Sequence, residues 1–119
     1  MRKEQRLTKT AEFTAVFEEG KAWVNNLLVM RARPNGLGRN RYGFSVGKRT
    51  GKAVVRNRVK RLLREGVRLT PTKSGWDMVL VARNPAATAD YHRIKAAIQD
   101  LFARANLLDK KGKEAEGNL

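Results

Sequence analysis

The residues with the clearest chemical potential in this chain are lysines and arginines, and most of them gather in its middle. From Arg39 to Arg68, eleven cations stand against the single acid Glu65, which gives this stretch a net charge of +10, out of +15 for the whole protein. A guanidinium binds a phosphate through paired, charge-assisted hydrogen bonds, and each cation that contacts a polyanion releases a counterion. The patch therefore predicts binding to a nucleic acid.

A helix predicted over residues 53–69 carries much of this charge on one side. On a helical wheel of about 100° per residue, the apolar arc holds Val55, Val59, Leu62, Leu63, Gly66 and Leu69. The opposite side holds Arg56, Asn57, Lys60, Arg61, Arg64 and Arg68. Like charges four residues apart cost a helix roughly a few tenths of a kcal/mol each, and a merely solvated face usually mixes both signs. The one-sided charge favours a binding surface.

The loop before this helix adds cations where a helix attracts anions. Its sequence, VGKRTGKAV, brings Lys48, Arg49 and Lys52 to the predicted helix start, together with two glycines. Glycine lets a backbone approach a phosphate closely, and the helix dipole stabilises negative charge at this end. The string lacks the G-x-x-x-x-G-K-[ST] pattern of a P-loop, so it indicates phosphate contacts and only weakly a nucleotide site.

The residue types in the patch favour RNA over DNA. The sequence contains neither a zinc-finger ligand set nor the aromatic octapeptide of RNA-recognition motifs. A helix that reads bases in a DNA groove needs several Asn or Gln side chains among its arginines, and only Asn57 is available. Recognition of shape and phosphates suits a structured RNA.

Residues that could cleave a bond are few. His92 is the only histidine, and in the first turn of a predicted helix we expect it to be solvated or to cap. The acids are scattered along the chain, and there is no cysteine. A nuclease acting alone would need a general base or ligands for its metal ions. We therefore predict no catalytic residue and no metal site in the protein itself.

Periodicity and turn residues predict the elements that position the patch. We expect one domain over residues 1–106, in the order α-β-β-β-α-β-α, and a disordered charged tail over residues 107–119. The first helix is expected to be capped by Thr8 or Thr10 and to end at Gly20 with a positive φ. Two strands are expected within residues 21–33, and residues 34–38 are expected to form a hairpin loop.

The later elements carry distinct patterns. In a strand over 41–47, Tyr42, Phe44 and Val46 share one face, and Gly43, Ser45 and Gly47 leave the other face nearly bare. The unbroken apolar run Met78 to Ala82 predicts a strand over 76–83 that is covered on both faces. Thr88 is expected to cap the last helix, and Asn106 to end it.

The ends of the chain show neither the apolar core of a secretory signal nor a run long enough to span a membrane. We therefore expect a cytoplasmic protein without a membrane partner.

Three strings together resemble the bacterial ribonuclease P protein subunit over about residues 3–105: RLTKTAEFTAVFEEG, RYGFSVGKRTGKAVVRNRVKRLLRE and WDMVLVARNPAA. The resemblance implies an α+β domain with a mixed four-stranded sheet, similar to domain 2 of ribosomal protein S5. It also implies a left-handed β-α-β crossover through helix 53–69, where the general rule would give a right-handed one.

In function, the resemblance implies a subunit that binds a catalytic RNA and precursor tRNA, with no obligate protein partner. The RNA, which mainly holds the Mg²⁺, removes the 5′ leader, and the protein tightens and broadens substrate binding.

The resemblance assigns most of the patch to an anchor on the catalytic RNA. Its residues are Lys48, Arg49, Lys52, Arg56, Asn57, Arg58, Lys60, Arg61, Arg64 and Arg68. Two of these leave alternatives open. Arg58 falls at the edge of the apolar arc and could brace the helix against the sheet, and Asn57 could orient a neighbouring arginine.

A second set is implied to bind the single-stranded leader in a central cleft floored by the bare face of strand 41–47. Its residues are Arg6, Lys9, Phe13, Phe17, Arg31, Arg33 and Ser45. The phenylalanines could instead form the core stripe of their helix, and Arg31 and Arg33 could simply face solvent. A structural RNA-binding protein of the ribosomal type remains the alternative for the whole chain, because it would share the charge but need no leader cleft.

Overall fold

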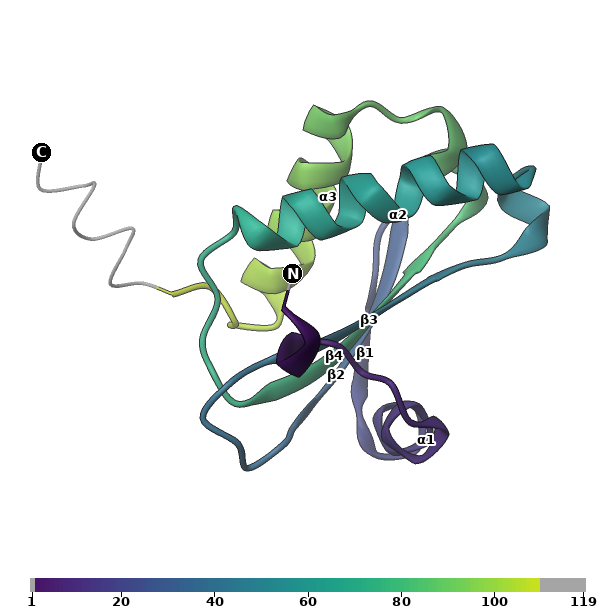
Figure 1. Ribbon diagram of the computed structural model, residues 1–119. Coiled ribbons are helices and arrows are strands. Elements are labelled where there is room, and N and C mark those ends of the chain that lie inside the picture. The colour runs from purple at the N-terminus through teal and green to yellow at the C-terminus, as the bar shows by residue number, and fades with distance from the viewer. Residues whose placement is uncertain (1, 110–119) are drawn as a thin grey trace, which may run out of the picture.

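The computed structural model describes residues 2–109 and confirms the expected order of elements (Figure 1). The helices are α1 (Thr10–Glu19), α2 (Ala53–Arg68) and α3 (Tyr91–Arg104). The strands are β1 (Lys21–Val24), β2 (Leu28–Pro34), β3 (Arg41–Val46) and β4 (Trp76–Ala82). Three short 3₁₀ helices, η1 (Lys3–Gln5), η2 (Lys48–Thr50) and η3 (Asn84–Thr88), lie in the connections.

The four strands form one mixed sheet in the order β1-β2-β4-β3, with β3 and β4 parallel and the other pairs antiparallel. The predicted hairpin between β2 and β3 is wrong, because β4 lies between them. The apolar run of β4 explains this position: Met78, Val79 and Leu80 are fully buried, as expected of a central strand. The handedness of the β3-α2-β4 crossover and the likeness to ribosomal protein S5 stay predictions.

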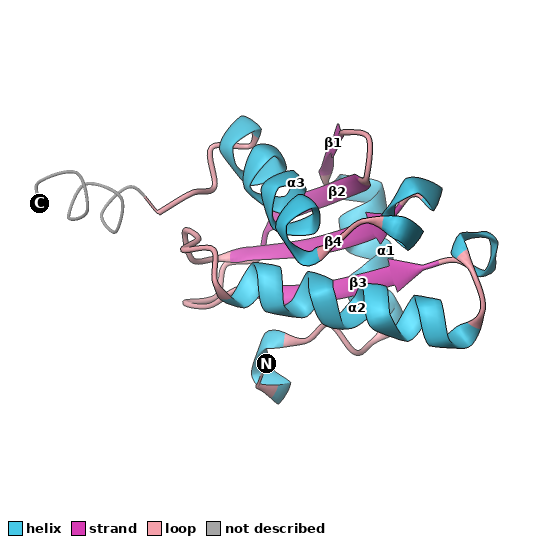
Figure 2. Cartoon of the chain, turned by 90° about the horizontal axis from the view of Figure 1, so that it is seen from above, coloured by secondary structure: helices cyan, strands magenta, loops and turns pink. Residues whose placement is uncertain are grey.

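Helices cover the two faces of the sheet unequally. Figure 2 shows α2 running along β3 and α3 lying over the β1–β2 side, while α1 lies on the opposite face. The main core lies under α2 and α3, where Tyr42, Met30 and Leu80 pack. A smaller cluster under α1 is built on Leu7, Val16 and Val79. The face under α2 and α3 is therefore largely covered, and the face under the short α1 is covered to a smaller extent.

The buried side of α2 is turned slightly from the predicted arc. Val59, Leu63 and Gly66 are buried as expected, but Val67 is also buried, and Leu69 is 42% exposed because the helix ends at Arg68. At Gly66 the helix approaches α3 closely, since a Cβ there would lie 2.6 Å from Cδ1 of Ile98.

The end of α1 nearer the N-terminus is capped differently from the expectation. Oε1 of Glu12 accepts from the backbone N–H of Thr8 (3.0 Å) and of Lys9 (2.9 Å), so a carboxylate in the first turn replaces the predicted threonine cap. At the other end, the predicted positive φ of Gly20 is wrong, since its φ is −79°. A Cβ on Gly20 would instead collide with the backbone oxygen of Val16.

The ends of α3 confirm one expectation and correct another. Asp90, not Thr88, is the N-cap, and its Oδ1 accepts from the N–H of Arg93 at 2.8 Å. Thr88 lies in η3. Asn106 follows the helix with a φ of 58°, as expected of a terminator.

The packed chain extends beyond residue 106, where the charged tail was expected to begin. Leu107 is 1% exposed, and its backbone oxygen accepts from the N–H of Lys73 at 2.8 Å. Leu108 pairs with Thr72 in an isolated bridge. The rest of the predicted tail, residues 110–119, lies outside the described residues. No helix within residues 2–109 combines the length and the apolar character needed to cross a bilayer.

Candidate nucleic-acid interface

Six residues on the outer side of α2 form what we call the α2 basic face: Arg56, Asn57, Lys60, Arg61, Arg64 and Arg68. Lys60, Arg61 and Arg64 have neither an ion pair nor a side-chain hydrogen bond with any described residue. Asn57 is exposed, and its amide likewise orients no arginine within residues 2–109. Unpaired cations in a row are available to phosphates, because no internal contact must be broken first.

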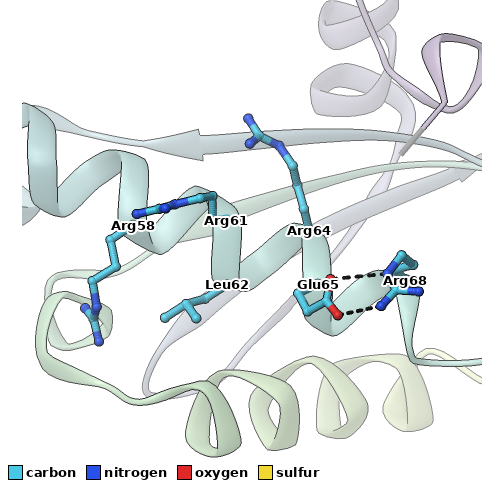
Figure 3. A pocket seen from close by; sticks show the side chains of 6 residues that line it. All are labelled: Arg58, Arg61, Leu62, Arg64, Glu65 and Arg68. Carbon is cyan, nitrogen blue, oxygen red and sulfur yellow. Dashed lines mark hydrogen bonds and ion pairs between the residues drawn. The ribbon is translucent and has the colours of Figure 1, made fainter.

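The one acid on α2 is neutralised within the helix. Glu65 accepts from Arg68 at both oxygens, at 3.2 Å and 2.5 Å, as the dashed lines in Figure 3 show. This hydrogen bonding lowers the pKa of Glu65. Together with Arg58, Arg61, Leu62 and Arg64, the pair lines a hollow of about 470 Å³. Arg68 is therefore a weaker phosphate ligand than its unpaired neighbours.

The side chain of Arg58, whose role the helical wheel left open, is hydrogen-bonded within the fold. Its Nη1 donates to the backbone oxygen of Ala87 (3.1 Å), and its Nη2 donates to that of Ala89 (2.8 Å). These carbonyls belong to the segment between β4 and α3, so Arg58 ties α2 to η3 rather than to the sheet. In Figure 3 its side chain points away from Arg64.

The loop before α2 holds three further cations at the start of the helix. Its centre, η2, is fixed by Thr50, which is buried and donates from Oγ1 to Oδ1 of Asn84 at 3.4 Å. Lys48, Arg49 and Lys52 are exposed and have no protein partner within residues 2–109. No side chain caps α2, so its first backbone N–H groups point toward the same region.

A buried ionic cluster fixes α1 across the sheet. Arg41 of β3 donates to both oxygens of Asp77 on β4, at 2.8 Å and 2.7 Å, and its Nη1 pairs with Oε2 of Glu12 on α1. Asn35 donates to Oδ1 of Asp77 at 2.9 Å. Burial would raise the pKa of Asp77, which is 0% exposed, but the hydrogen bonds from Arg41 and Asn35 outweigh it and lower that pKa. The backbone N–H groups of Lys9 and Thr8, with Arg41, lower the pKa of Glu12.

Phe13 lies directly over Gly43, so this part of the expected bare floor is covered. A Cβ on Gly43 would overlap the ring. Phe13 packs against the cluster of Leu7 and Val79, as its core interpretation expected. The ring also lines a groove of about 160 Å³ at the outer edge of β3, where Arg6 bridges to Tyr42, with Lys60 and Arg64 among the other lining residues. We call this hollow the edge groove.

Phe17 is not a core residue, since it is 43% exposed. The guanidinium of Arg31 lies 5.5 Å from its ring centroid, and Nη1 of Arg31 donates to its backbone oxygen at 3.0 Å. Arg33, two residues along β2, pairs with Glu19 at 3.3 Å. Both arginines are thus tied to α1 rather than left free in solvent.

Beyond α1, one row of the sheet face stays open. The strand register aligns Ser45, Val81, Val29 and Val24 on the α1 side, one row further along than Gly43 and Val79. Ser45 is exposed, Val24 is 47% exposed, and the other two are half-buried. We call these four residues the open row. It presents a floor of one serine and three valines, one row along from Arg31, whose guanidinium lies over the ring of Phe17.

A family model described as Ribonuclease P matches residues 1–106. The chain belongs to the ribonuclease P protein family.

Relatives and solved structures of this family cover most of the chain. The ribonuclease P protein component of Caldanaerobacter subterraneus subsp. tengcongensis is 47% identical over 108 residues, spanning 89% of this chain and 93% of the relative. That of Dehalococcoides mccartyi strain 195 is 42% identical over 110 residues, 92% of each chain. The RNase P protein structure from Staphylococcus aureus has a TM-score of 0.80 at 28% identity, over 88% of this chain and 98% of that one. The RNase P protein structure from Thermotoga maritima has a TM-score of 0.74 at 31% identity, over 83% of this chain and 96% of that one.

In this ribonuclease P protein, the two sets of site residues expected from the sequence are not separate. Lys60 and Arg64, expected on the RNA anchor, line the edge groove with Arg6 and Phe13 of the expected leader site. Ser45 lies on the sheet face beyond, Phe17 lies on α1 with its ring against Arg31, and Lys9 is exposed at the start of α1. The cationic helix and the aromatic side of α1 therefore meet around the edge of β3.

Sequence reasoning missed the residues that hold this arrangement together. Glu12, Arg41 and Asp77 were not assigned to any site, although their contacts orient α1 and hence Phe13. The available signal was Asp77 itself, a single acid beside the longest apolar strand run. His92 is exposed, with its ring 5.8 Å from that of Tyr91. Within residues 2–109, no three His, Asp or Glu side chains gather closely enough to hold a metal ion.

Proposed function

We propose that this ribonuclease P protein binds a catalytic RNA through the α2 basic face and the loop before it, and binds the 5′ leader of precursor tRNA on the α1 side. The observation that carries the proposal is the edge groove, where unpaired cations of α2 and the ring of Phe13 line one hollow. An RNA held by α2 is thereby brought next to a surface that suits a single strand.

The anchor on the catalytic RNA consists of the cations without internal partners. These are Lys48, Arg49, Lys52, Arg56, Lys60, Arg61 and Arg64. Each phosphate that they neutralise releases counterions, so the affinity should fall steeply with salt. Arg58 is left out of this set because its guanidinium is bound to Ala87 and Ala89. Arg68 contributes less because Glu65 shares its charge.

The leader site is the open row together with Phe17 and the edge groove. An exposed aromatic ring can stack on a base, which is worth about 1–3 kcal/mol. Arg31 lies against the ring of Phe17 and supplies positive charge beside it. The proposal leaves hydrolysis to the RNA, whose phosphates are suited to hold Mg²⁺.

The test is reconstitution with the cognate catalytic RNA at low Mg²⁺, followed by binding measurements on precursor and mature tRNA. We expect the protein to increase leader removal, and Phe17→Ala to weaken precursor binding about tenfold, with mature tRNA unaffected. The control is Leu37→Ala, another partly exposed apolar residue, in the loop before β3. No gain in leader removal would refute the proposal. Equal losses for precursor and mature tRNA would favour a structural RNA-binding protein without leader recognition.

A further inference from the structure

A polar pocket of about 320 Å³ lies at the end of α2, where it adjoins the α2 basic face through Arg68. Its wall is built by η1, the loop before β3, Tyr42 of β3, the last two residues of α2, and the loop between α2 and β4. In Figure 1, η1 lies below the part of α2 that leads into the chain toward β4. We call it the hydroxyl pocket, because Tyr42, Thr70, Thr72 and Ser74 line it. Its volume is at the lower end of the range for small-ligand sites, roughly 300–1,000 Å³.

The shape of the pocket is fixed by a buried asparagine. Asn40 is 9% exposed, and its Nδ2 donates to the hydroxyl of Tyr42 (3.2 Å) and the backbone oxygen of Lys73 (2.8 Å). Its Oδ1 accepts from the N–H of Trp76 at 2.8 Å. With the asparagine fully engaged, the loop between α2 and β4 is locked onto the start of β3.

The inner wall presents hydrogen-bond acceptors. Oγ1 of Thr70 donates to the backbone oxygen of Gly66, and Oγ1 of Thr72 donates to that of Thr70, both at 2.7 Å. Each hydroxyl has thus used its proton inside the protein and keeps acceptor capacity, which Thr72 shares with the neighbouring Tyr42 hydroxyl. These oxygens suit a ligand that brings O–H or N–H donors.

The rim presents donors and positive charge. Nε of Arg39 donates to the backbone oxygen of Glu4 at 3.0 Å, which fixes the side chain while its terminal nitrogens have no partner among the described residues. Oε1 of Gln5 accepts from the N–H of Arg2 at 3.2 Å, and this leaves its amide nitrogen available. None of the ten residues that line the pocket is acidic.

We propose that the hydroxyl pocket binds one unpaired nucleotide of an RNA strand. Ribose and base donors meet the threonine oxygens inside, and the phosphate meets Arg39 at the rim. An inorganic anion would not fill the volume, and sulfate would have no proton to donate to the inner wall. Tyr42 lines both this pocket and the edge groove, and the segment Gln5 to Leu7 runs between them, so one RNA strand can reach both.

Binding of a nucleotide in this pocket rests on the proposed function only because it requires an RNA partner. The nucleotide can come from the catalytic RNA or from the precursor tRNA. Site-specific crosslinking separates these sources. Because the chain has no cysteine, Ser74→Cys gives one position for a photoactivatable group, and exposed Ala96→Cys on α3 is the control. The particle is irradiated with catalytic RNA alone and with precursor added.

We expect Ser74→Cys to crosslink to one or two adjacent unpaired nucleotides, about tenfold above the control. A crosslink formed with the catalytic RNA alone assigns the nucleotide to that RNA. A crosslink that forms only after precursor tRNA is added assigns it to the precursor. Crosslinks no stronger than those of Ala96→Cys in both arms overturn the proposal. If the wild-type particle still removes the leader, the proposed function stands without the pocket.

A charge variant tests binding without a label. Gly38 lines the pocket with open space around it, so Gly38→Glu places a carboxylate at the rim without a clash. We expect its affinity for the crosslinked RNA to fall about tenfold relative to Ala96→Glu. Unfolding in urea establishes that both variants are folded. An equal effect of the two substitutions contradicts binding in the pocket.

Discussion

Replacing Arg41 by glutamine removes the cation that joins β3, β4 and α1. Asp77 is fully buried and would keep only Asn35 as a side-chain donor, and Glu12 would lose its partner on the sheet. Removing one partner of a buried ion pair costs about 3–5 kcal/mol. Asp77 keeps its hydrogen bond from Asn35, and the Arg41 side chain is 19% exposed. We therefore expect the free energy of unfolding to fall by about 3 kcal/mol, near the lower limit of this range.

Urea unfolding measures this loss, with the fluorescence of the half-buried Trp23 and Trp76 as the signal. The matched control is Arg68→Gln, which breaks the exposed pair with Glu65, where both side chains are about half exposed. Such surface pairs contribute less than about 1 kcal/mol. A loss for Arg41→Gln no larger than that for Arg68→Gln would refute the role assigned to the buried cluster.

The same cluster predicts the direction of a pH dependence. The pKa values of Asp77 and Glu12 are lowered in the folded protein, so their stabilising contribution is complete above the unfolded-state values, about 4. It is lost as the pH falls through the lower folded values. Urea unfolding at pH 7 and in steps below pH 4 should therefore show the difference between wild type and Arg41→Gln shrinking. A constant difference would contradict this linkage.

Two further substitutions separate folding from RNA binding. Arg58→Gln should destabilise the protein by about 1–3 kcal/mol in urea, because two partly buried carbonyls lose a charged donor, and leave the salt dependence of RNA binding unchanged. A flatter salt dependence would show that Arg58 contacts RNA. Gly43→Ala should cost about 1–3 kcal/mol by forcing the ring of Phe13 aside, and should weaken precursor binding more than mature tRNA binding. Unchanged stability would mean that Phe13 is not packed on this glycine.

The elements of this fold could be predicted because each carries its own local pattern. The apolar run of β4, the two-sided α2 and the alternation in β3 all appear where the sequence indicated. Two errors are local, since Glu12 and Asp90 replace the expected threonine caps, and the larger errors concern features that depend on distant residues. The position of β4 between β2 and β3 depends on burial of the whole sheet, and the rotation of α2 toward Val67 depends on how it packs against that sheet.

In the candidate site, too, the sequence predicted residue types and spacing but not the contacts between distant residues. Residue types and spacing indicated a cationic helix and two phenylalanines at i and i+4, but not which cations are already engaged. The helical wheel left the role of Arg58 open, and the structure shows that its guanidinium binds two backbone oxygens of the segment between β4 and α3, whereas the side chain of Arg64 has no protein partner among residues 2–109. Phe13 and Phe17 also differ. The ring of Phe13 packs on Gly43, whereas the ring of Phe17 lies against the guanidinium of Arg31 and stays exposed.

The central claim is that the unpaired cations of α2 hold the catalytic RNA. The most direct test is the affinity of the triple variant Lys60→Gln, Arg61→Gln, Arg64→Gln for that RNA as a function of salt. The matched control replaces Lys21, Arg93 and Lys95, which lie on β1 and α3. The slope of log K against log salt should flatten by about 0.7–0.9 for each phosphate that a variant no longer neutralises. We therefore expect it to flatten by about two in the α2 variant. In the control variant, the slope should stay unchanged. Equal slopes for the two variants would contradict the account.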